Sequence, residues 1–164
     1  MDIEKLINNI IPPADYRHRN GFSNSDIIDQ LNEHEKKLVE EILINKLLGQ
    51  TDDTLIVETL AYLKSEKALS ILYDFLERCS DPMAKIISAT SIFEINGDTD
   101  MIDIAVASFR KLEDDKNPYY IYILPFAFNY LIKFKSAKVN SIIEEYTNHK
   151  EYLISYNAKK TLGK

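Results

Sequence analysis

The chain has 164 residues, of which 45% are hydrophobic and 28% are charged. These values exclude an intrinsically disordered chain, because disordered segments have too few apolar residues to offset the entropy lost on folding. A chain of this length can bury a core without disulfides or a structural metal. Its single cysteine, Cys79, also excludes an intrachain disulfide. We predict one domain over residues 1–164.

The net charge of −6 is unevenly distributed along the chain. Residues 1–115 hold 23 acidic and 12 basic side chains, whereas residues 116–164 hold 3 acidic and 8 basic ones. The sequence therefore predicts an acidic body and a basic carboxyl-terminal end, and this asymmetry bears on the choice of partner rather than on the fold.

The first residues lack the basic and apolar regions of a signal peptide. The longest apolar run, Tyr119 to Ile132, is shorter than the roughly 20 residues that a membrane-spanning helix needs. We therefore predict a cytoplasmic protein that does not associate with a membrane.

Helix is the predicted structure in most of the chain, because apolar residues recur at intervals of three and four and no stretch shows strict alternation. Asp81-Pro82 and Asn117-Pro118 are the clearest helix starts, since each combines a capping side chain with a proline in the first turn. Residues 11–24 are expected to form an irregular loop after a first helix. The predicted helices span about residues 2–10, 25–31, 33–48, 52–64, 66–79, 82–96, 99–114, 118–133, 136–147 and 150–162.

One proline falls inside a predicted helix. Pro125 lacks the N–H that would continue the helical hydrogen bonds and restricts the residue before it. We expect the helix at 118–133 to kink or split near Leu124.

The helices after residue 50 show a repeated apolar pattern, with anchors at Leu63, Ile95 and Phe134 that are 32 and 39 residues apart. Linkers of one to four residues favour antiparallel neighbours. We therefore predict an all-α fold, a right-handed stack of antiparallel helix pairs over residues 25–164. The apolar positions of the last helix are expected to be Leu153, Tyr156 and Leu162.

Three segments carry a resemblance to a known family: Leu60-Ala61-Tyr62-Leu63, Ser91 to Ile95 followed by Gly97-Asp98, and Tyr152 to Leu162. The chain resembles the HEAT-like α-helical repeat proteins over roughly residues 50–164. The resemblance implies a scaffold that binds a partner. The chain is also similar to small bacterial proteins of this architecture that act as immunity partners of secreted toxins.

The sequence contains no pattern typical of a catalytic or cofactor site. The three histidines lie in different segments, none with a second histidine or a cysteine at helical spacing, and no glycine-rich phosphate loop is present. Asp15 precedes His18, and Glu145 precedes His149, but each pair is half of a metal site. We predict that the protein is not an enzyme and holds no metal or cofactor.

A candidate binding surface comes from the outward positions of the helices predicted at 66–79 and 99–114, which are expected to line the concave side of the stack. The acidic residues at these positions are Asp74, Glu77, Asp100, Asp103 and Asp114. Such a surface would attract basic ligands and repel nucleic acid. The alternative is a charged surface that serves solubility alone.

A second candidate surface is the tyrosine-rich segment that begins with Tyr119, Tyr120 and Tyr122. It has more apolar residues than one helix face can bury, so either the helix is central or the segment docks a partner or a second copy. Seven of the ten tyrosines lie between Tyr119 and Tyr156, among several lysines, which leaves open an alternative role in binding nucleic acid or as a scaffold.

The leading prediction is a protein-binding module. Combined with the resemblance, it becomes an immunity or inhibitor protein that neutralises a basic, nuclease-type bacterial toxin through its acidic surface. The oligomeric state is left open.

Overall fold

The structure is a computed structural model that describes residues 2–113 and 117–164. Within these two ranges the regular structure is entirely helical, which confirms the predicted all-α class. The helices are α1 (Ile3–Ile10), α2 (Tyr16–Arg19), α3 (Ser25–Asp29), α4 (Glu33–Leu48), α5 (Thr54–Tyr62), the 3₁₀ helix η1 (Glu66–Ala68), α6 (Leu69–Arg78), α7 (Pro82–Asn96), α8 (Asp100–Arg110), α9 (Tyr120–Leu131), the 3₁₀ helix η2 (Ile132–Phe134), α10 (Ala137–Glu144) and α11 (Tyr152–Thr161).

The helix ends follow from local capping chemistry. Asp81 accepts a hydrogen bond from the Ala84 amide at 2.7 Å and starts α7 at Pro82, as predicted. Gly97 ends α7 in the left-handed conformation, with φ of 74°, which side chains with a Cβ rarely adopt. Asn117 instead caps the Tyr119 amide at 3.0 Å, and α9 starts three residues after this cap, at Tyr120.

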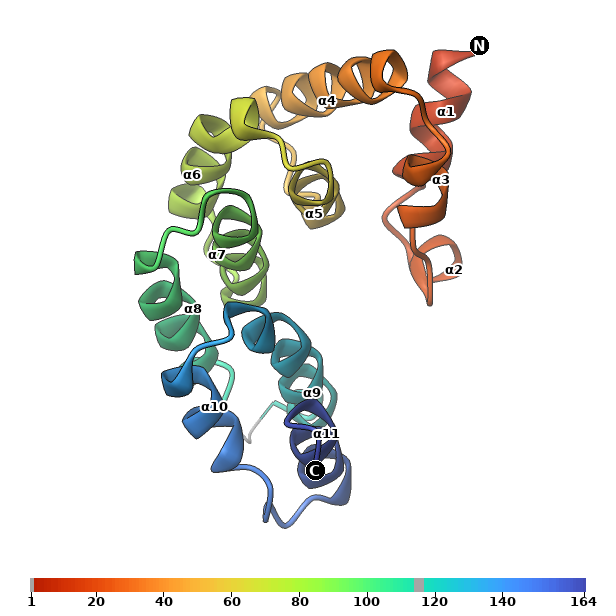
Figure 1. The fold of residues 1–164 in the computed structure, drawn as a ribbon. Helices are drawn as coiled ribbons and strands as arrows, with labels where there is room; N and C mark the ends of the chain where they lie inside the picture. The colour runs from red at the N-terminus through yellow and green to blue at the C-terminus, as the bar shows by residue number, and fades with distance from the viewer. Residues whose placement is uncertain (1, 114–116) are drawn as a thin grey trace.

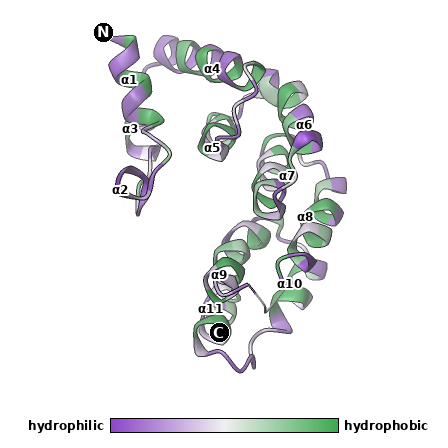
Figure 2. Cartoon of the chain, turned by 180° about the vertical axis from the view of Figure 1, so that it is seen from behind, coloured by the Kyte–Doolittle hydropathy of each residue, from purple (hydrophilic) through white to green (hydrophobic). Residues whose placement is uncertain are grey.

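The helices from α4 to α11 form two rows along an arc (Figure 1). The inner row contains α5, α7, α9 and α11, and the outer row contains α4, α6, α8 and α10, so that consecutive α helices alternate between rows. Figure 2 shows the same two rows from behind, with α4 alternating between hydrophobic and hydrophilic turns. The amino-terminal helices α1–α3 lie at the end of the arc where α4 begins.

Buried side chains from Ile7 to Ala158 form one cluster that runs between the two rows. Its largest members include Phe75, Phe109 and Phe128, which are fully buried. The predicted apolar positions of the last helix were partly wrong: Leu162 packs against the core, but Leu153 and Tyr156 are exposed, and α11 buries Ile154 and Ala158 instead. The helix packs against α9 through a face that its own apolar pattern does not identify, since Leu153 and Ile154 are equally apolar neighbours.

Residues 11–24 are more ordered than the sequence suggested, since they contain α2. Asn24 is buried and donates hydrogen bonds to the Ile10 carbonyl at 3.0 Å and to the Thr59 hydroxyl at 2.8 Å. Arg19 binds both carboxylate oxygens of Asp53, at 2.8 and 2.7 Å. These contacts fix the amino-terminal segment against α5.

Of the two outcomes expected at Pro125, a kink or a split, the split does not occur, because α9 continues from Tyr120 to Leu131 through the proline. Pro125 lacks the donor for one hydrogen bond within the helix, to the carbonyl four residues before it. The ring of Pro125 is itself buried, and burial of Leu124, Ala127 and Phe128 on the same helix offsets the missing bond.

Candidate protein-binding surface

Four of the five acidic residues singled out in the sequence, Asp74, Glu77, Asp100 and Asp103, lie on helices of the outer row. Asp74 and Glu77 are exposed on α6, and Asp100 is exposed in the first turn of α8. The predicted concave position of these helices was wrong, since α6 and α8 lie on the convex side of the arc (Figure 1). Whether a helix lies in the inner or the outer row depends on its packing against other helices, such as that of α5 against α7. The apolar period of a single helix does not reveal this packing.

The acidic character of the outer row is partly neutralised by its own cations. Lys138 of α10 lies 2.6 Å from Asp103, and Arg110 contacts both carboxylate oxygens of Glu145 at 2.9 Å. The Arg110 guanidinium lowers the pKa of Glu145 below its ordinary value. Asp114 lies outside the residues that the structure describes.

The tyrosine-rich segment forms the start of α9 in the inner row. Tyr119 is 67% exposed and Tyr122 is 61% exposed, whereas Tyr120 is half-buried and contacts the ring of His149. The structure therefore places the acidic and the tyrosine residues on opposite rows and does not bring them together. Tyr130 and Tyr146, by contrast, are buried.

Further exposed aromatic side chains, none of which the sequence analysis assigned to a binding surface, extend this tyrosine region. Phe126 of α9 is 49% exposed, and on the adjacent α11 Tyr152 and Tyr156 are 76% and 48% exposed, with their rings stacked at 5.7 Å. We call the following five residues the aromatic surface: Tyr119, Tyr122, Phe126, Tyr152 and Tyr156. Their spacing, at i, i+3 and i+7 on α9 and at i and i+4 on α11, was the signal that could have shown one face of each helix.

A groove adjoins the aromatic surface at Phe126. It has a volume of about 640 Å³ and lies between residues 19–25, α5 and the end of α9. Glu58 of α5 lies in this groove, where the Tyr130 hydroxyl donates a hydrogen bond to its carboxylate at 2.7 Å. Burial raises the pKa of Glu58 above its ordinary value, and burial together with the Glu58 charge raises the pKa of Tyr130.

The sequence analysis missed Glu58, although one signal was present. It is the only charged residue between Asp53 and Lys64, in a segment that is otherwise apolar or small. A lone carboxylate in such a helix must either reach solvent or face a polar partner. Tyr130, which is 72 residues away in sequence, provides that partner.

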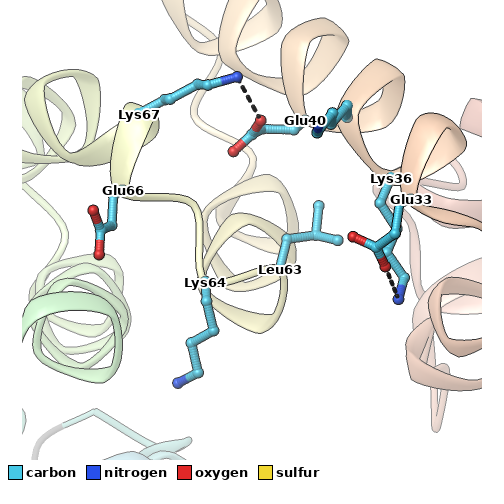
Figure 3. Close-up of a pocket in the computed structure, with 8 residues that line it drawn as sticks. Glu33, Lys36, Glu40, Leu63, Lys64, Glu66 and Lys67 are labelled. Atoms are coloured by element: carbon cyan, nitrogen blue, oxygen red, sulfur yellow. Dashed lines mark hydrogen bonds and ion pairs between the residues drawn. The ribbon is translucent and has the colours of Figure 1, made fainter.

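Another hollow lies on the other side of α5, between α4 and the turn into η1 (Figure 3). Its volume is about 400 Å³, and Leu63 points into it from the end of α5. Its charged groups are largely satisfied within the protein. Lys67 pairs with Glu40 and Lys36 with Glu33, each at 3.4 Å, and Lys64 donates to the Glu94 carbonyl at 2.7 Å. Lys37 and Glu66 also line this hollow, outside these pairs, and contribute one charge of each sign.

The half-sites around histidine are also satisfied locally. His18 Nδ1 lies 2.8 Å from both oxygens of Asp15, and this hydrogen bonding lowers the pKa of Asp15. His149 accepts from the Glu151 amide at 3.1 Å. Over residues 2–113 and 117–164, no group of three or more potential metal ligands comes together. None of the helices in these ranges is both long and apolar enough to cross a bilayer.

Comparisons of the chain with protein-family models, with curated proteins and with solved structures found no match of any kind.

Proposed function

We propose that this protein is a binding module that holds another protein against its aromatic surface. The observation that carries the proposal is the exposure of five aromatic side chains on two packed helices, α9 and α11, of the inner row. Among the described residues, seven of the nine large exposed hydrophobic side chains belong to α5, α9 and α11 or to the residue that caps α9. Such concentration on one row is typical of an interaction surface rather than of scattered surface residues.

The composition of α9 supports the same proposal. Its twelve residues include no charged side chain, although three of its aromatic positions, counting the capping Tyr119, are exposed. Charged residues are depleted and aromatic residues are enriched at the centres of protein interfaces. A tyrosine that becomes buried there contributes a large contact area at a low cost in side-chain entropy.

The more specific form of the proposal concerns the partner. We propose that the partner is a basic, nuclease-type toxin domain. This protein would then act as an immunity protein that neutralises the toxin by binding it. The net charge of −6 and the exposed Asp74, Glu77 and Asp100 would accelerate the approach of such a partner, and the aromatic surface would hold it. We propose a cytoplasmic location for this role. We also propose a right-handed, HEAT-like stack of antiparallel helix pairs, and the alternation of helices between two rows supports that arrangement.

Nucleic acid is the second candidate, because Tyr152 and Tyr156 are stacked and exposed on the same helix as Lys159 and Lys160. Other cations of the carboxyl-terminal end are already paired. Lys133 contacts Glu94, Lys138 contacts Asp103 and Lys164 contacts Glu144. These pairs reduce the positive field that phosphate binding needs, and the protein partner is therefore preferred.

The proposal is tested by affinity capture with the tagged protein from its native host, followed by binding measurements on the purified captured protein. The variant Tyr122→Ser with Tyr156→Ser removes two exposed rings, and Leu48→Ser, an equally exposed position at the end of α4, is the matched control. We expect one stoichiometric basic protein, lost in the double variant and retained by the control. Capture of nucleic acid alone would favour the second candidate, and retention by the double variant would contradict the aromatic surface.

A further inference from the structure

The groove beside α5 has one carboxylate, Glu58, and two cations, Arg19 and Lys133, among its lining residues. Its walls come from three parts of the chain that are distant in sequence: residues 19–25, α5, and the end of α9 with the following η2. The aromatic side chains among its lining residues are Phe22, Tyr62, Phe126 and Tyr130. Phe126 and Tyr130 meet edge to face, with 5.2 Å between ring centroids.

Glu58 is the unbalanced charge of this groove. Two neighbouring carboxylates have cations of their own: Asp53 binds Arg19, and Glu94 lies 3.2 Å from Lys133. Glu58 has only the neutral hydroxyl of Tyr130, and no ion pair joins it to any cation in the described part of the chain. The single hydrogen bond uses one oxygen, Oε1, so that Oε2 can accept from a ligand.

The aromatic walls suit a cation as well as the carboxylate does. The Lys133 ammonium already lies over the Tyr130 ring, 5.5 Å from its centroid, which shows that this ring accepts a positive charge on its face. A long basic side chain would place its methylene groups against Phe126 and its charged end at Glu58. A carboxylate among aromatic rings disfavours phosphate, and one free carboxylate provides too few oxygen ligands for a calcium or magnesium ion.

We propose that this groove receives an arginine or lysine side chain of the partner protein, which pairs with Glu58 and packs against Phe126 and Tyr130. This inference rests on the proposed function, because Phe126 belongs both to the aromatic surface and to the groove. It assigns one specific contact to the basic partner: a charge-assisted hydrogen bond in a partly desolvated site, which is stronger than an exposed pair.

The groove is tested without the native partner by a titration followed by NMR. The probe is the blocked tripeptide acetyl-Gly-Arg-Gly-amide, and its control is the same peptide with citrulline, which keeps the shape of arginine but carries no charge. We expect the arginine peptide to shift the signals of Tyr62, Phe126 and Tyr130 in a saturable manner at millimolar concentration, with the citrulline peptide at least about tenfold weaker.

The matched variants are Glu58→Gln in the groove and Glu41→Gln at an exposed position of α4 in the outer row. Glutamine can still accept from Tyr130, so the groove variant is expected to fold, which a thermal melt checks. Glu58→Gln should abolish the shifts caused by the arginine peptide, and Glu41→Gln should leave them unchanged. Absence of shifts with the wild-type protein, equal binding of both peptides, or unaltered binding by Glu58→Gln would overturn the inference.

Binding of the captured partner separates this inference from the proposed function. We expect Glu58→Gln to weaken the partner by at least about tenfold and Tyr122→Ser to weaken it as well. If only Tyr122→Ser weakens the partner, the groove inference fails and the proposed function stands. If only Glu58→Gln weakens binding of the partner, the aromatic surface is not the binding site, and the peptide titration still tests the groove.

Discussion

The ion pair between Arg19 and Asp53 is expected to stabilise the attachment of the amino-terminal segment to α5. The two side chains are 21% and 16% exposed, and Arg19 also donates from Nε to the Pro12 carbonyl at 2.9 Å. The Asp53 hydrogen bond raises the pKa of Arg19, so that the guanidinium stays charged at any accessible pH. An Arg19→Met variant keeps the aliphatic stem and removes these polar contacts.

The size of this effect follows from the burial of the pair. Exposed ion pairs contribute about 0–1 kcal/mol, whereas breaking a fully buried one costs about 3–5 kcal/mol. Since both side chains are about four-fifths buried, we expect a coupling energy of about 2 kcal/mol between them. Asp53 also caps α5 by accepting from the Leu55 amide at 3.1 Å. Asp53→Asn keeps that cap, because asparagine is an equally good capping residue.

The assay is a double-mutant cycle of Arg19→Met and Asp53→Asn, with the free energy of unfolding measured in urea. The control cycle uses the exposed pair of Lys36 and Glu33, whose carboxylate is 86% exposed. Its coupling should not exceed about 0.5 kcal/mol. A coupling energy between Arg19 and Asp53 that is no larger than that of the control would refute the reasoning. It would also contradict the claim that residues 19–25, which form one wall of the groove, are fixed against α5.

Further predictions concern stability, pH and association rate. Burial raises the pKa of Glu58, so the folded state holds that proton more tightly than the unfolded state, and ionisation costs stability as the pH rises from about 4, the ordinary pKa of a glutamate, through the raised pKa of the folded state. Glu58→Gln should therefore gain stability relative to wild type over that range in urea unfolding, and a constant difference would contradict this. Phe128→Ala empties a fully buried site between two aromatic rings and should lower the free energy of unfolding by about 3–5 kcal/mol; a loss under about 1 kcal/mol would mean that Phe128 is not in the core. Neutralising Asp74, Glu77 and Asp100 together should slow association with the captured partner and flatten its dependence on salt while dissociation is unchanged, as stopped-flow kinetics can determine.

Much of the helical content could be predicted because it depends on local chemistry. The apolar period and the caps of α4 to α8 lie within a few residues of each other in sequence, and these elements formed as expected. The arrangement of rows could not be predicted, since an amphipathic helix shows the same stripe whether it packs from the inner or the outer side. The position of Asp74 and Glu77 on the convex side follows from that arrangement.

The candidate site depends on contacts between residues that are far apart in the sequence. Glu58 meets Tyr130 across 72 residues, and Asn24 meets Thr59 across 35. The lone charge of Glu58 in an apolar segment indicates that it needs a polar partner, but the local sequence does not identify Tyr130 as that partner. Tyr156 was expected at an apolar position of the last helix, although an aromatic residue at helical spacing is compatible with either a buried or an exposed position. Exposure of this ring became evident only once α11 was placed with Ile154 and Ala158 toward the core.

The central claim is that the aromatic surface holds a partner protein, and the most direct measurement is the affinity of the captured partner for Tyr122→Ala by isothermal titration calorimetry. Leu48→Ala on α4 serves as the control of equal exposure. A central interface tyrosine should contribute about 2 kcal/mol, which corresponds to a dissociation constant roughly 30-fold weaker. The account predicts that loss for Tyr122→Ala and an unchanged constant for Leu48→Ala, whereas equal affinity of the two variants would contradict it.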